Sequence, residues 1–145
     1  RVVRGNLVYA YGALRALAGW APANFEVELD GGERRTLTGY SVAAANSQAY
    51  GGGMLLAPGA SLEDGLLDIV MISQISKLRF LRLLPTVFRG AHVGQPNVEV
   101  LRARSVRVSA DRAFALYADG DPIGELPVTI EALPAAVSVL APAPA

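Results

Sequence analysis

Apolar and polar residues alternate in short runs along most of the chain, a pattern typical of strands that are buried on one face. The first run covers residues 25–29 and is followed at 30–33 by Asp-Gly-Gly-Glu, a hairpin-turn signal. A second strand is expected over 36–46, and a buried, almost wholly apolar one over 66–72. Five more short strands are predicted at 98–101, 105–108, 113–118, 126–132 and 136–140.

Two segments instead repeat their apolar residues near the helical period. The first runs from residue 3 to about residue 20, and the second covers 76–89 with Ser76 as the expected N-cap. Pro85 should kink or divide the second helix, because proline lacks a backbone N–H. The broad apolar face of this helix is expected to pack on the core, with contact to an anionic membrane surface as the alternative.

The predicted strands do not alternate with helices, which argues against a doubly wound parallel sheet. We therefore expect a mainly β (α+β) fold, an antiparallel and sandwich-like sheet with one or two packed helices. Residues 1–145 are interpreted as one domain, with a frayed end at 141–145. Because the sequence opens on arginine rather than methionine, we expect it to be a piece of a longer protein.

Composition narrows the classes of function. With 145 residues, 52% of them hydrophobic, the chain can bury a substantial core. Its 13 basic and 13 acidic residues balance, which argues against a nucleic-acid partner. It has no cysteine for disulfides or thiolate zinc sites, and its one histidine, His92, is expected to be structural or exposed. No run suits a membrane span or a signal peptide, and a cytoplasmic location is expected.

The most distinctive segment is 51–68, which joins a glycine run, a Pro-Gly turn and three carboxylates in front of an apolar strand. Glycines let the backbone approach a ligand closely, and carboxylates beside such a loop can hold a hard cation such as Mg²⁺. Asp64 fits either a metal ligand or a turn-capping residue, and Asn46 either a strand end or a cleft residue. Asp68 is expected to cap or orient the loop rather than to perform chemistry.

A second acidic turn, Asp119-Gly120-Asp121, lies far downstream. Asp-Gly is typical of a tight hairpin turn. A positioned carboxylate can also accept the proton of an attacking hydroxyl group. If the fold brings this turn and the glycine-rich segment together, they form the acidic half of a phosphoryl-transfer site.

These motifs resemble the C-terminal domain of the bacterial diacylglycerol kinase and lipid kinase family, which is related to sphingosine kinases and more distantly to NAD kinases. The resemblance extends over nearly the whole chain. It rests on Asn46 with the glycine run, Ala57-Pro58, the Asp-Gly-Leu-Leu-Asp string at 64–68, residues 81–100, Asp111-Arg112, the turn at 117–122 and the closing apolar segment.

The resemblance implies a two-domain kinase whose active site lies in a cleft between its lobes. The complete enzyme would transfer the γ-phosphate of ATP to a lipid hydroxyl group, with diacylglycerol as the expected substrate and phosphatidate as the product. The Gly-Gly-Asp-Gly-Thr loop of a nucleotide-binding lobe is absent from this sequence, and so is a P-loop. The 145-residue chain is therefore expected to be inactive alone.

Carried over by motif, Asp121 is the general base, at a position where the family usually has glutamate. Asp64 supplies the carboxylate ligand of a Mg²⁺ ion, with main-chain carbonyl groups near Ser61 and Leu66. The glycine run would let a lipid head group or phosphate approach the main chain. The expected cleft residues are Asn46, Gly51, Gly52, Gly53 and Asp119.

The implied partners are a lipid substrate and the inner, cytoplasmic face of a membrane. Specificity of the sphingosine kinase or NAD kinase type stays open. So does a different class of function, a non-catalytic module that docks lipid or a protein partner through an apolar groove. Such a module would need neither Asp121 nor Mg²⁺. A homodimer formed through an edge strand or the first helix is also left open.

Overall fold

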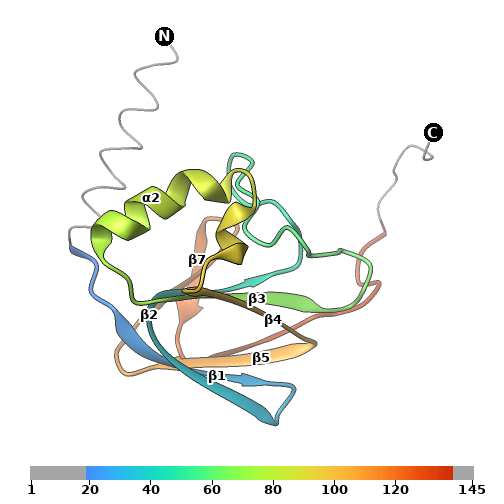
Figure 1. The fold of residues 1–145 in the computed structure, drawn as a ribbon. Coiled ribbons are helices and arrows are strands. Elements are labelled where there is room, and N and C mark those ends of the chain that lie inside the picture. Colours follow the sequence, from blue (N-terminus) through green and yellow to red (C-terminus); the bar gives the residue numbers. More distant parts are fainter. Residues whose placement is uncertain (1–18, 139–145) are drawn as a thin grey trace.

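A computed structural model describes residues 19–138 of the protein. Six strands form one sheet in the order β4–β3–β2–β1–β5–β8, and two more form the separate hairpin β6–β7 (Figure 1). Every pairing is antiparallel, as predicted. The strands are β1 Ala23–Leu29, β2 Glu33–Ala45, β3 Leu67–Ser73, β4 Val98–Ala103, β5 Ser105–Ala110, β6 Ala115–Ala118, β7 Asp121–Glu125 and β8 Val128–Glu131.

The main core lies on the inner face of a strongly curved sheet. Strands β3 and β5 are separated in the sheet by β2 and β1, yet Ile69, Val27 and Val106 from β3, β1 and β5 pack in one buried cluster. Figure 1 accordingly shows β3 and β4 lying above β1 and β5. This closure of the sheet on itself is the predicted sandwich-like arrangement.

Strand β3 is buried on both faces, which explains its unbroken apolar sequence. Ile69 and Met71 belong to the main core, while Val70 between them packs in a second cluster with Leu83 and Val98. Successive side chains of a strand point to opposite faces, so this division follows from the alternation along β3.

Helix α2, Lys77–Val87, covers the outer face of the sheet through Phe80, Leu83 and Val87. Ser76 is its N-cap, as predicted, and its hydroxyl oxygen accepts a hydrogen bond from the Arg79 N–H at 3.3 Å. The prediction that Pro85 divides the helix is wrong, because α2 continues through it for two residues. Pro85 lies in the last turn, and the one helical hydrogen bond that it removes is its own donation to the Leu81 carbonyl.

The remaining differences fall near the chain end. Strand β7, Asp121–Glu125, was not predicted, because Pro122 and Gly124 are poor strand formers. The strand predicted at 136–140 is wrong over 136–138, which have no regular structure after the turn at Pro134. The rest of that strand, the helix predicted at 3–20 apart from its last two residues, and the tail 141–145 lie outside the described residues.

Within the described part of the chain, no helix has the length and hydropathy needed to cross a bilayer. A short 3₁₀ helix, η1 Ala91–Gly94, joins α2 to β4 and contains His92, which is fully buried. His92 is therefore a structural residue, one of the two roles expected for it.

Candidate functional site

The segment between β2 and β3 opens with a tight turn around the three consecutive glycines. Tyr50 and Met54 close it through two main-chain hydrogen bonds, of 2.8 and 3.1 Å. Gly51, Gly52 and Gly53 have φ angles of 35°, 67° and 89°, which side-chain-bearing residues rarely adopt. The glycine run is thus needed to make this turn.

The glycine turn exposes groups that are able to bind a ligand. No described residue accepts a hydrogen bond from the main-chain N–H groups of Gly51, Gly52 or Gly53. Asn46, just after the end of β2, is exposed, and its side-chain amide has no hydrogen-bond partner among residues 19–138. Successive N–H groups in a turn form a concave site that suits an anion.

The next part of the segment is fixed to the body of the protein. The Leu55 N–H donates to the Val87 carbonyl at 3.0 Å, which joins the segment to the end of α2. His92 Nε2 donates to the Leu56 carbonyl at 2.9 Å. The main chain at Gly90 lies so close to Pro58 that an added Cβ would be 2.5 Å from the ring Cγ. These contacts leave little freedom for the backbone at 55–58.

The predicted metal-binding residues form two small local turns. The Glu63 N–H donates to the Ser61 hydroxyl oxygen at 3.2 Å, and the Leu66 N–H donates to Asp64 Oδ1 at 2.9 Å. The second contact is the turn-capping role expected as the alternative for Asp64. Asp64 Oδ2 points towards Arg102 but lies 3.9 Å from its Nη1, beyond hydrogen-bond distance.

Arg102 of β4 connects this loop to the core. Its Nε donates to Asp68 Oδ1 at 3.2 Å, and one Nη donates to the Gly59 carbonyl. Asp68 is only 3% exposed, and its Oδ2 has no hydrogen-bond partner among the described residues. Arg102 therefore links both ends of the segment 59–68, and Asp68 orients the loop as predicted.

The second acidic motif forms the tip of the β6–β7 hairpin. Ala118 pairs with Asp121, so Asp119 and Gly120 are the two turn residues, with φ angles of 50° and 98°. Positive φ at both positions is the hairpin geometry that Asp-Gly favours. Asp121 is exposed, and no described residue forms a hydrogen bond or ion pair with its carboxylate.

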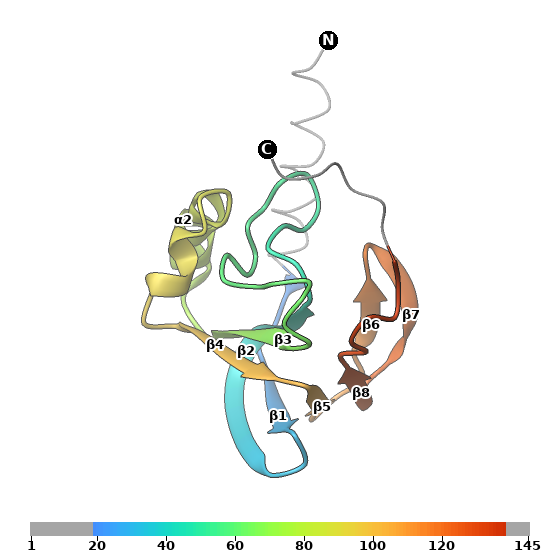
Figure 2. The same ribbon diagram turned by 90° about the vertical axis from the view of Figure 1, so that its right-hand side faces the viewer.

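The fold brings the two candidate regions to the same side of the sheet. Figure 2 shows the segment between β2 and β3 and the β6–β7 hairpin rising in the same direction, with α2 beyond that segment. Asp64 and Asp68 are brought together through Arg102. No hydrogen bond or ion pair within residues 19–138 joins Asp119 or Asp121 to the glycine turn.

A hard cation such as Mg²⁺ fits the donors of the 61–66 loop in chemical type. Carboxylate and carbonyl oxygens are the ligands it prefers, and Asp64 Oδ2 has no hydrogen bond in the described structure. Asp64, Asp68 and Arg102 together carry one net negative charge, so a divalent cation would not meet a positive site. Residues 19–138 contain no cluster of three or more acidic or histidine side chains.

Sequence reasoning missed Arg102. Its direct cross-strand partner is Asp68, in the register that joins β3 to β4. The available signal was Asp68 as the one charged residue of β3 and Arg102 as the one basic residue of β4, which also contains Glu99. The contact between Asp68 and Arg102 could have been predicted only if the pairing of β3 with β4 had been known.

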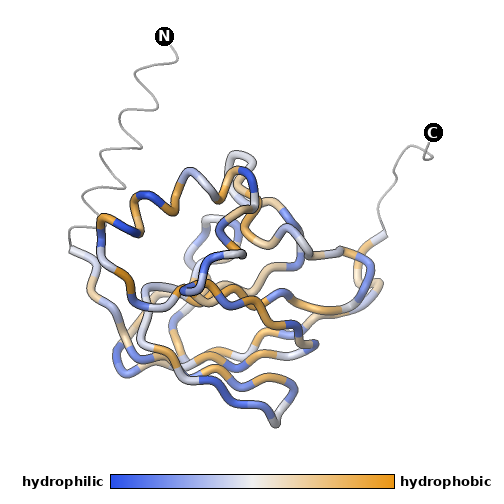
Figure 3. The backbone as a smooth tube through the Cα atoms, in the orientation of Figure 1, coloured by the Kyte–Doolittle hydropathy of each residue, from blue (hydrophilic) through white to orange (hydrophobic). Residues whose placement is uncertain are grey.

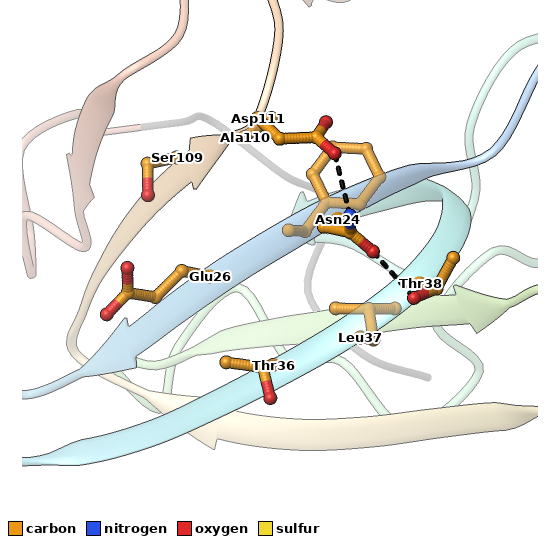
Figure 4. Close-up of a pocket in the computed structure, with 9 residues that line it drawn as sticks. Asn24, Glu26, Thr36, Leu37, Thr38, Ser109, Ala110 and Asp111 are labelled. Atoms are coloured by element: carbon orange, nitrogen blue, oxygen red, sulfur yellow. Dashed lines mark hydrogen bonds between the residues drawn. The ribbon is translucent and has the colours of Figure 1, made fainter.

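A hollow of about 520 Å³ lies elsewhere, over β1, β2 and β5, and contains none of the predicted site residues (Figure 4). Two of its polar groups face Asn24, which donates to Asp111 and accepts from the Thr38 hydroxyl, both at 2.7 Å. These groups already satisfy one another, so the hollow offers little for a ligand.

Comparison with known proteins gives relatives over almost the whole chain. The model of the family described as "YegS C-terminal NAD kinase beta sandwich-like domain" matches residues 1–141. A diacylglycerol kinase of Mycobacterium tuberculosis is 41% identical over 95% of this chain and 44% of its own length. A diacylglycerol kinase of Bacillus subtilis is 29% identical over 88% of this chain and 42% of its own.

More distant relatives include another lipid kinase and a solved structure of similar fold. A probable YegS-like lipid kinase of Chromohalobacter salexigens is 27% identical over 92% of this chain and 43% of its own. A solved structure of a putative diacylglycerol kinase from Bacillus anthracis superposes on 83% of this chain with a TM-score of 0.66 and 19% identity, a likeness of fold. This chain covers 42% of that structure, and it spans less than half the length of the curated relatives described.

Proposed function

The chain belongs to the family of YegS C-terminal, NAD kinase β-sandwich-like domains, and we propose that its parent protein transfers the γ-phosphate of ATP to a diacylglycerol-like lipid. The observation that carries this proposal is the 41% identity to a diacylglycerol kinase over 95% of the chain. Within the proposal, the described residues supply the lipid-side and acidic groups of the site. A preceding lobe supplies the nucleotide contacts.

Asp121 is the proposed general base. In the reaction the lipid hydroxyl oxygen attacks the γ-phosphorus, the bond from that phosphorus to the bridging oxygen breaks, and ADP leaves. The hydroxyl proton passes to the carboxylate of Asp121. This carboxylate is exposed and has no partner among the described residues, so nothing in this part of the protein competes for the proton.

The glycine turn is the proposed place where the phosphate or lipid head group meets the main chain. Its three free N–H groups can donate to phosphate oxygens without any side chain intervening. Asn46 adds a side-chain amide at the same end of β2. Asp119 is proposed to orient the hairpin tip beside Asp121.

Mg²⁺ is the proposed cofactor besides ATP, held by the Asp64 carboxylate with carbonyl groups near Ser61 and Leu66. A bound Mg²⁺ ion neutralises negative charge near the transferred phosphoryl group. The chain's own contribution is to hold Asp64 in place. Leu66 does this by donating to Oδ1, and Arg102 does it by anchoring the two ends of the loop.

The test is transfer of labelled γ-phosphate from ATP by the parent protein, presented with diacylglycerol, sphingosine, monoacylglycerol and NAD. We expect labelled phosphatidate, and an activity lowered by about 10²- to 10⁴-fold in Asp121→Asn. Asp121→Glu, which restores the residue usual in the family, should remain active. Glu125→Gln is the matched control, since it removes another exposed carboxylate from the same strand.

The possible results distinguish between the candidate functions. If the label enters sphingosine or NAD alone, the protein is a kinase whose substrate is not diacylglycerol. A folded protein that binds ATP and labels none of the acceptors would refute lipid phosphorylation and favour a non-catalytic binding module. Full activity in Asp121→Asn would remove Asp121 from the role of base.

A further inference from the structure

Helix α2 presents apolar side chains to solvent as well as to the core. Phe80, Leu83 and Val87 are buried, but Leu78 and Phe88 are 59% and 55% exposed. Leu84 between them is also exposed. Figure 3 shows hydrophobic and hydrophilic residues interspersed along the helix.

The same surface is basic. Arg79, Arg82 and Arg89 are exposed, and none of their guanidinium groups forms an ion pair or a hydrogen bond with a described residue. Residues 74–98 contain no aspartate or glutamate, although the whole chain has no net charge. The positive charge of this segment is therefore uncompensated within its own sequence.

Three arginines in other parts of the described structure do pair with carboxylates. Arg34 pairs with Glu28 at 3.0 Å, Arg35 pairs with Glu33, and Arg102 pairs with Asp68. Compensating carboxylates are thus available to this protein and are used on the sheet. Among the described residues, no carboxylate pairs with Arg79, Arg82 or Arg89, and these three arginines form a surface that suits an anionic partner.

We propose that this surface, the α2 outer face formed by Leu78, Arg79, Arg82, Leu84, Phe88 and Arg89, docks on an anionic lipid bilayer. This inference rests on the proposed function, because a kinase acting on a membrane lipid works at a bilayer surface. Apolar side chains can enter the boundary between head groups and acyl chains, while guanidinium groups bind lipid phosphates. Charge complementarity favours a bilayer of anionic lipid over a neutral one.

The placement of α2 agrees with this role. In Figure 2 the segment that contains the glycine turn lies between α2 and the β6–β7 hairpin. A bilayer bound by α2 would therefore approach the side of the sheet from which both candidate regions rise. The β1–β2 turn, with its paired charges, lies at the opposite side of the molecule (Figure 1).

The experiment is flotation of the parent protein with vesicles of phosphatidylglycerol and phosphatidylcholine, compared with vesicles of phosphatidylcholine alone. We expect binding only to the anionic vesicles, weakened by salt. Replacing Arg79, Arg82 and Arg89 by glutamine should lower the affinity by about 100-fold, at roughly fivefold for each charge. The triple arginine-to-lysine variant should bind, because it keeps the charge.

A second variant tests the apolar residues of the α2 outer face. Leu78→Ser with Phe88→Ser should lower the affinity by about tenfold, and this loss should persist at high salt. The matched control replaces Arg34, Arg35 and Arg107 by glutamine, which removes the same charge from the sheet and should leave vesicle binding close to that of the unmodified protein. Circular dichroism of each variant checks that the fold is intact.

Vesicle binding that is equal in the glutamine variant and the unmodified protein would overturn the proposal. In that case another part of the parent protein binds the bilayer. Kinase activity measured in neutral detergent micelles is independent of bilayer docking. If the unmodified parent protein phosphorylates no lipid in micelles, the proposed function is contradicted. If it is active in micelles and the glutamine variant docks on vesicles equally well, only the proposed role of the α2 outer face is contradicted.

Discussion

The two halves of the candidate site are held in very different ways. The segment 55–68 is tied to α2 through Val87, to η1 through His92 and to β4 through Arg102. The tip of the β6–β7 hairpin has no such ties. Asp119 and Asp121 have no side-chain partner among residues 19–138, and Tyr117 and Ile123 beside them are 61% and 62% exposed.

This difference indicates that the two halves contribute in different ways. The braced segment can hold Asp64 in one geometry before any ligand binds, which reduces the cost of ordering the site. Among the described residues, the hairpin is anchored only at its base, where the Leu126 N–H donates to the Phe114 carbonyl and Phe114 packs on Phe25. The position of Asp121 then depends on what meets the tip in the parent protein.

Alanine substitutions at two glycines with positive φ should have unequal effects, with the larger loss at Gly90, which lies against Pro58 of the braced segment. Its φ of 67° already disfavours a side chain, and a Cβ would lie 2.5 Å from Pro58 Cγ. We predict that Gly90→Ala lowers the free energy of unfolding by about 3 kcal/mol, through backbone strain and overpacking. Urea denaturation of the chain measures it.

The matched variant is Gly120→Ala in the hairpin turn. Its φ is 98°, but nothing lies within 4 Å of the added Cβ, so strain alone should cost about 1 kcal/mol. Equal losses at the two positions would mean that segment 55–58 moves aside without difficulty, contrary to a rigid brace.

Breaking the Arg102 brace should have the next largest effect. Arg102→Met leaves Asp68, which is buried, without its charged donor, and we predict a loss of about 2 kcal/mol. This loss is smaller than is usual for breaking a fully buried pair, because the arginine is half-exposed. In the double variant with Asp68→Asn, the buried group is neutral, and part of the loss should be recovered.

A double-mutant cycle on these two residues separates pairing from simple loss of packing. We expect a coupling free energy of at least about 1 kcal/mol between Asp68 and Arg102. Arg107→Met is the control, an exposed arginine on β5 without a carboxylate partner in the described structure. Additive losses in the cycle would show that Arg102 acts through its aliphatic stem alone.

The same contrast explains how far the sequence predicts this structure. Strands such as β1 and β5 follow from alternation, because one face of each is buried. The turns at Asp30-Gly31 and Asp119-Gly120 follow from residues that tolerate positive φ. Ser76 marks the start of α2, since its hydroxyl group caps the first turn.

The features that were missed depend on tertiary contacts. Strand β7 contains Pro122 and Gly124 and forms through its pairing with β6 rather than through its own propensity. The Asp68–Arg102 pair depends on the register between two strands, which a local pattern does not contain. The structural role of His92 was expected, but its contact with the Leu56 carbonyl was not, because the two residues are 36 positions apart.

The smallest effect on stability is expected at the hairpin tip. Tyr117→Ser combined with Ile123→Ser should change the free energy of unfolding of this chain by less than about 0.5 kcal/mol, because both side chains are already in water. Val70→Ser, in the buried face of β3, should cost about 3 kcal/mol in the same urea titration.

If the paired tip variant instead destabilises the chain by more than about 1 kcal/mol, residues 117 and 123 are packed against something within this chain, and the tip is not free. If stability is unchanged while the parent protein loses lipid phosphorylation, the two side chains act through a contact made outside residues 19–138, which is what a hairpin anchored only at its base would require.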